Sequence, residues 1–146
     1  MGHVVLEGAM AALPPVEGGY FDHAALAAGD SGWANGVHPP AWLRGLPRHA
    51  LGTSLYFSDE DQILRLSEQV NGLQRLGKDG PIGRQDTTLF PTGAFRFVDC
   101  AGVQDRVPEL ELDRTHQYYR RIPAVRDDIA AAFAGTAPVG TTILGG

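Results

Sequence analysis

The sequence predicts a mixed α+β fold that is mainly β. Short strands and a hairpin are expected to pack with one long amphipathic helix (about 59–76) and a second short helix (about 124–134). These two segments carry apolar stripes at helical spacing, whereas the other apolar segments are short. Glycine and proline supply 19 and 10 of the 146 residues and separate those segments, which predicts long ordered loops.

The length predicts a single domain over residues 1–146, since domains cluster near this size. No internal repeat and no linker divides the chain. We expect an N-terminal arm (1–15) and a C-terminal tail (136–146) that are engaged in contacts with neighbouring chains. Segments so rich in glycine and proline need contacts to offset the entropy that ordering costs.

The N-terminal third predicts two short elements. His3–Leu6 is expected to form a short strand. Asp22–Ala28 is expected to form a short helix, with Asp22 as the N-cap and Gly29 as the C-terminal stop. The region Gly18–Pro47 is otherwise interrupted by glycine and proline and predicts a long loop.

The middle of the chain predicts a strand followed by the long helix. Thr53–Phe57 is rich in residues that favour a pleated sheet. Ser58 is then a suitable N-cap for a helix over Asp59–Leu76, and Gly77 is a suitable stop. The apolar stripe of this helix consists of Ile63, Leu66, Val70, Leu73 and Leu76.

A hairpin is expected after the long helix. Its arms are Asp86–Phe90 and Ala94–Val98, which flank the turn sequence Pro91-Thr92-Gly93. Pro108–Asp113 alternates apolar and charged residues and predicts a further strand.

The C-terminal part predicts the second helix and a last strand. Pro123 suits the first position of the helix, and Gly135 suits its end. Val139–Leu144 is β-prone.

Composition excludes several classes of function. The net charge of −5 argues against general nucleic-acid binding, because phosphate neutralisation needs a basic surface. Cys100 is the only cysteine, so neither an intrachain disulfide nor a cysteine-based zinc site is expected. The start of the chain lacks the features of a signal peptide, and no apolar run approaches the roughly 20 residues of a membrane span.

The sequence predicts neither a metal site nor a cofactor. No two histidines have the spacing that places both imidazoles on one metal ion. The histidines are His3, His23, His38, His49 and His116. No catalytic residue is assigned.

Aromatic and cationic residues predict a protein interface. Two tryptophans lie in the long loop, and two tyrosines precede two arginines near the second helix. Such a tyrosine–arginine run can stack bases, but in an acidic protein it favours protein contacts. The candidate interface residues are Trp33, Trp42, Tyr118, Tyr119, Arg120 and Arg121.

One string resembles an enzyme family. Gly52-Thr53-Ser54-Leu55-Tyr56-Phe57-Ser58, followed by a helix, is similar to the strand and turn of ADP-ribosyltransferase folds. The resemblance implies a small NAD-using transferase with a cleft beside Tyr56.

Two other strings resemble the head-decoration (capsid cement) proteins of lambda-like tailed phages. One runs from Thr87-Thr88-Leu89 through Thr92–Asp99, and the other is Ala132–Ala137. The resemblance implies a compact β-rich domain that sits as a trimer on the capsid.

We therefore expect a non-enzymatic structural subunit of a large assembly, first of all a tailed-phage virion protein such as a capsid decoration or connector protein. It would act through protein–protein interfaces in the virion or the host cytoplasm. Its expected partners are other protein subunits, either copies of itself or capsid and tail proteins, and neither nucleic acid nor a membrane. The alternatives are the ADP-ribosyltransferase-like enzyme and a small adaptor or immunity-type module whose acidic surface meets a basic partner.

Overall fold

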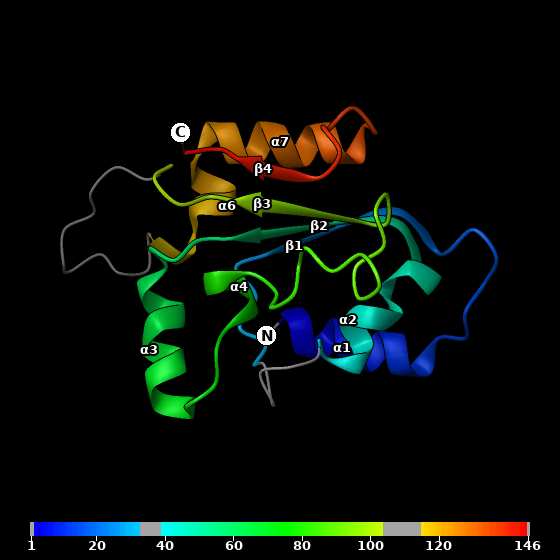
Figure 1. The fold of residues 1–146 in the computed structure, drawn as a ribbon, viewed down its shortest axis with the longest axis horizontal. Helices are drawn as coiled ribbons and strands as arrows, with labels where there is room; N and C mark the ends of the chain where they lie inside the picture. The colour runs from blue at the N-terminus through cyan, green and yellow to red at the C-terminus, as the bar shows by residue number, and fades with distance from the viewer. Residues whose placement is uncertain (1, 33–38, 104–114, 146) are drawn as a thin grey trace.

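The computed structural model describes residues 2–32, 39–103 and 115–145 (Figure 1). Strands in these residues form one sheet of four parallel strands, in the order β1-β2-β3-β4. They are β1 (Phe21–Ala27), β2 (Ala50–Phe57), β3 (Phe95–Asp99) and β4 (Thr141–Ile143). The prediction of a mixed α and β fold is confirmed, with 39% helix and 20% strand.

Helices cover both faces of the sheet (Figure 1). One face is covered by α1 (Gly2–Ala12), α2 (Ala41–Gly45), the 3-10 turn η1 (Leu46–Arg48) and α4 (Leu76–Asp79). The opposite face is covered by α6 (Tyr118–Arg121) and α7 (Pro123–Phe133). α3 (Gln62–Asn71) lies beside the carboxyl ends of the strands. None of the described helices is long and apolar enough to cross a membrane.

The two faces have separate hydrophobic cores because successive strand residues point to opposite sides. Leu55 and Phe97 pack against α2 and α4 on one face. Tyr56 and Val98 pack against α6 and α7 on the other. A strand covered on both faces has no exposed side, which explains why every residue of β2 from Thr53 to Phe57 is buried.

The predicted long helix is wrong in its bounds. α3 begins one residue after Asp61, whose side chain accepts a hydrogen bond from the Leu64 N–H at 3.0 Å. It ends at Asn71 because Gly72 adopts a left-handed φ of 65°. The stripe beyond that point belongs to a turn and to α4. The stripe is also wrong in part: Leu66 and Val70 are 53% and 76% exposed, and the buried leucine of α3 is Leu64, which the predicted stripe does not contain.

The predicted hairpin is also wrong, and the fold is not mainly β. β3 pairs in parallel with β2 and β4. Asp86–Phe90 forms turns instead of a strand, with the Phe90 N–H donating to the Asp86 carbonyl at 2.9 Å. Phe90 packs edge-on against Phe95 and Phe97. The aromatic residues of the expected arms therefore meet in the core without pairing as strands.

The two N-terminal elements are the reverse of the prediction. His3–Leu6 lies in helix α1, and Asp22–Ala28 includes most of strand β1. Pairing of β1 with β2 outweighs the helix propensity of its alanines. The strands expected over Thr53–Phe57 and Val139–Leu144 and the helix after Pro123 are confirmed. The strand expected over Pro108–Asp113 lies outside the described residues.

Both ends of the described chain belong to the fold. α1 packs against α2, and β4 pairs with β3. Contacts of the expected arm and tail with a neighbouring chain stay a prediction.

Candidate functional site

A groove of about 690 Å³ runs along the outer edge of β1. β1 is first in the strand order, and no described strand pairs with its outer edge. α1 lines one side of the groove through Gly2, His3 and Leu6. α7 lines the opposite side through Ile129 and Phe133. The free edge of the strand therefore lies between two helices that belong to opposite faces of the sheet.

Small side chains keep this groove open. Its floor contains Ala24, Ala25 and Ala27, which leave space that larger residues would fill. Phe21 and Phe133 border it with 55% and 58% of their surfaces exposed. Exposed large aromatic residues beside an apolar groove are typical of a contact surface.

Main-chain groups of three residues face the open edge. The N–H of Ala28, directly after β1, donates to the Tyr56 carbonyl of β2 at 3.4 Å. Main-chain groups of successive strand residues alternate in direction. The same alternation turns the N–H and C=O groups of His23, Ala25 and Ala27 away from β2 and toward the groove.

A histidine–aspartate pair lies at the carboxyl end of the groove. His116 lines the groove, and its Nδ1 donates to Oδ2 of Asp61 at 2.8 Å. Asp61 is fully buried, whereas 32% of the His116 side chain is exposed. The hydrogen bond with Asp61 raises the pKa of His116 above its usual value, although burial opposes this shift. The carboxylate therefore fixes the orientation of the imidazole and favours its cationic form.

The other two histidines of the groove, His3 and His23, have lowered pKa values. The His3 ring lies over Gly29 and makes an edge-on contact with Trp42 at 5.6 Å between ring centroids. Nε2 of His23 lies 2.9 Å from the Ser54 hydroxyl oxygen. Burial lowers the pKa of both histidines. Both rings thus favour the neutral form.

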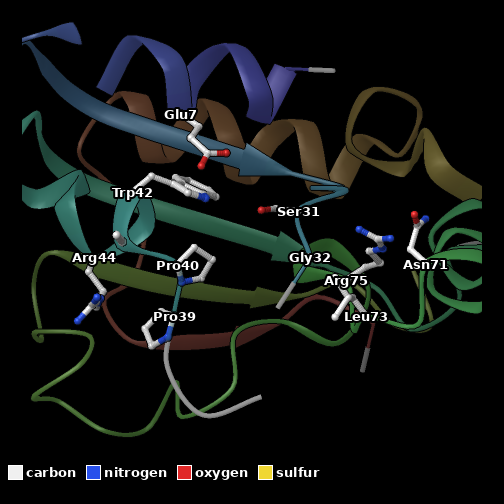
Figure 2. Close-up of a pocket in the computed structure, with 11 residues that line it drawn as sticks. Glu7, Ser31, Gly32, Pro39, Pro40, Trp42, Arg44, Asn71, Leu73 and Arg75 are labelled. Carbon is white, nitrogen blue, oxygen red and sulfur yellow. The ribbon is translucent and has the colours of Figure 1, made fainter. Parts of the chain in front are cut away.

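A second hollow of about 690 Å³ is polar (Figure 2). Glu7 and Trp42 lie at one end of it, and Asn71 and Arg75 lie at the other (Figure 2). Arg75 is 6% exposed, and its Nε lies 3.3 Å from a carboxylate oxygen of Asp30. The buried cation of this hollow therefore already has an anionic partner.

A buried polar cluster holds α7 on the sheet. Arg96 in β3 donates from Nη1 and Nη2 to the two carboxylate oxygens of Asp128 at 2.7 and 2.6 Å. The Tyr56 hydroxyl donates to the same carboxylate at 2.8 Å. Tyr56 is 1% exposed. Tyr56 lies in the core beneath α7, whereas the resemblance to ADP-ribosyltransferase folds implies a cleft beside it, so the cluster serves packing.

Only one of the two tryptophans expected at an interface belongs to the described residues. Trp33 lies outside the described residues. Trp42 is 9% exposed and packs in the core below the sheet.

The tyrosine–arginine run is divided between the core and the surface. Tyr118 has no exposed surface, and its hydroxyl donates to the Tyr56 carbonyl at 3.0 Å, so a partner cannot reach it. Tyr119 lines the groove, and Arg120 and Arg121 are exposed. An interface role for these three residues stays a prediction.

The described residues bring no group of three or more histidine, cysteine, aspartate or glutamate side chains together at a metal-binding distance. Cys100 is buried, and burial raises the pKa of its thiol to about 12. Such a thiol is a poor nucleophile near neutral pH.

Sequence reasoning missed the edge groove because it assigned the alanine-rich segment of β1 to a helix. It also missed the Asp61–His116 pair, whose members are 55 residues apart in the chain. Comparison with protein-family models, curated proteins and solved structures finds no match.

Proposed function

We propose that this protein is a non-enzymatic binding subunit that accepts an extended segment of a partner polypeptide as an added strand along β1. One observation carries the proposal: the outward main-chain groups of His23, Ala25 and Ala27 lie at the floor of an apolar groove. An extended backbone presents N–H and C=O groups at the spacing that such an edge requires.

The walls of the groove favour a single added strand over a second folded sheet. α1 and α7 flank the edge on opposite faces, and the alanine floor leaves room for apolar side chains on both sides of the added strand. Phe21 and Phe133 would be covered by such a strand. Burial of their exposed apolar surface would favour binding.

This mode of binding suits a structural subunit of a large assembly, such as a capsid decoration or connector protein of a tailed-phage virion. Exchange of extended segments connects neighbouring subunits through main-chain hydrogen bonds without requiring a large flat interface. The partner in the proposal is another protein subunit.

The test replaces a main-chain donor on the outer edge. Ala25→Pro removes an N–H that faces the groove, and proline is tolerated at such edge positions. We expect this variant to stay folded but to bind a panel of fluorescent peptides at least about ten-fold more weakly than the wild type. The peptides match β1 in length and carry valine at alternate positions, and binding is followed by fluorescence anisotropy.

Ala24→Pro is the matched control, because it tests whether the direction of the lost N–H matters. The same alternation points its N–H toward β2, so proline there removes a ladder hydrogen bond and should destabilise the fold by about 1–3 kcal/mol. If no peptide binds the wild type, or if Ala25→Pro binds as well as the wild type, strand addition at β1 is excluded.

A further inference from the structure

The cationic residues are distributed very unevenly along this chain. Residues 1–43 contain neither lysine nor arginine. All 12 lysines and arginines of the chain lie between Arg44 and the C-terminus. The same segment carries four carboxylates: Glu7, Glu17, Asp22 and Asp30. An excess of one charge sign in one segment is a feature that partner recognition can use.

This acidic segment supplies the floor of the groove and one of its walls. β1 and α1 both belong to it. Asp22 is exposed at the amino end of β1, and the side chain of Asp30, beyond the carboxyl end, is 49% exposed. The groove lining contains Asp30 but no lysine or arginine among its described residues.

Cations from other elements do not cancel this charge at both ends. Arg75 pairs with Asp30 at 3.3 Å and neutralises part of that carboxylate. His116, which lines the same end of the groove and favours its cationic form, offsets the charge of Asp30 further. Arg120 and Arg121 are exposed on α6 without lining the groove. The Asp22 carboxylate makes no hydrogen bond or ion pair with another side chain among the described residues. The amino end of the groove is therefore the more acidic end.

We propose that the segment accepted at β1 is apolar at alternate positions and carries lysine or arginine at the end that lies near Asp22. This inference rests on the proposed strand addition and names the chemistry of the partner. The apolar positions would occupy the alanine floor, and the cations would give the segment its specificity. Charge complementarity of this kind selects partners and speeds association.

The test compares two amidated peptides that match β1 in length. Both carry valine at alternate positions with threonine between, and they differ only in having lysine or glutamate at both ends. We expect the glutamate peptide to bind about ten-fold more weakly at low salt. The difference should shrink at about 0.5 M salt, where exposed charges are screened.

Asp22→Lys identifies the carboxylate responsible. We expect this variant to lose about three- to ten-fold in affinity for the lysine peptide and to gain for the glutamate peptide. Asp127→Lys makes the same charge change at an exposed position of α7 outside the groove lining and should leave both affinities within about two-fold.

The outcomes separate this inference from strand addition itself. Equal affinity for both peptides, with binding lost in Ala25→Pro, would overturn the basic-ended partner and leave strand addition intact. Binding of neither peptide, or binding that Ala25→Pro does not weaken, would overturn both. Asp127→Lys could also change the affinities for the lysine and glutamate peptides as much as Asp22→Lys does. That result would show that the net charge of the protein, rather than the groove, selects the peptide.

Discussion

The polar side chains that contribute most to the stability of this fold are buried and have a hydrogen-bonding partner. Asp61 caps α3 with one carboxylate oxygen and orients His116 with the other. A buried carboxylate that makes both contacts joins the start of a helix to a residue distant in sequence. The charge of His116 then affects how stable the fold is.

The Asp61–His116 pair predicts a pH dependence of stability. The folded-state pKa of His116 is raised above the 6.5 of a free imidazole. Its contribution is therefore complete below about pH 6.5 and is lost as pH rises through the raised value. We expect His116→Gln to reduce the free energy of unfolding more at about pH 5.5 than at about pH 8.5, measured by urea denaturation.

His23→Gln is the control of opposite sign. The folded-state pKa of His23 is lowered, so the wild-type residue costs stability as pH falls through 6.5. The loss caused by His23→Gln should therefore be smaller at the lower pH. A His116→Gln loss that does not change with pH would contradict a charged pair with Asp61.

Helices and strands in this protein owe their positions to contacts as much as to propensity. α7 has a suitable proline at its start but no side-chain cap, and its place on the sheet depends on the Arg96–Asp128 pair. Both side chains are at least nine-tenths buried. Burial opposes the charge of Asp128, yet the hydrogen bonds from Arg96 and Tyr56 lower its pKa overall.

Asp128→Asn should weaken the attachment of α7. The change leaves the Arg96 guanidinium buried without a counter-charge, and the expected loss is about 3–5 kcal/mol of unfolding free energy. Urea denaturation followed by circular dichroism measures it. Asp127→Asn, at an exposed position of the same helix, should cost less than about 0.5 kcal/mol. A loss below about 1 kcal/mol for Asp128→Asn would mean that apolar packing alone holds α7.

The molecule as a whole combines a layered core with an open sheet whose edge strands are β1 and β4. Both faces of the sheet are covered by helices, but the outer edge of β1 is not paired within the described residues (Figure 1). Exposed edges pair readily with other chains, and like charges are one way in which proteins prevent this. The acidic residues beside β1 are placed to discourage pairing of two copies.

The isolated chain should therefore be a monomer of 15.6 kDa at low salt. Screening at about 0.5 M salt should strengthen self-association through the edge by about ten-fold. Light scattering over a range of concentrations measures both states, and Ala25→Pro should stay monomeric in each. A dimer at low salt that persists in Ala25→Pro would mean that a different surface joins the copies.

Local sequence information was sufficient where neighbouring residues settle the conformation. The β-branched and aromatic residues of β2, the capped start of α3, and the proline-led start of α7 were all predicted within a few residues. Such signals act over one turn or one strand. Segments with weak or conflicting local signals, such as His3–Leu6 and Asp22–Ala28, were assigned to the wrong kind of element.

By itself, the sequence determined that this chain mixes helices with strands, where its strongest elements lie, and that it is acidic. Only the tertiary structure decided that the sheet is parallel, that β1 stands at its edge, and that Asp61 meets His116. Strand partners and buried polar pairs depend on contacts between residues far apart in the chain. Their free energies outweigh local propensity, and composition and spacing do not reveal them.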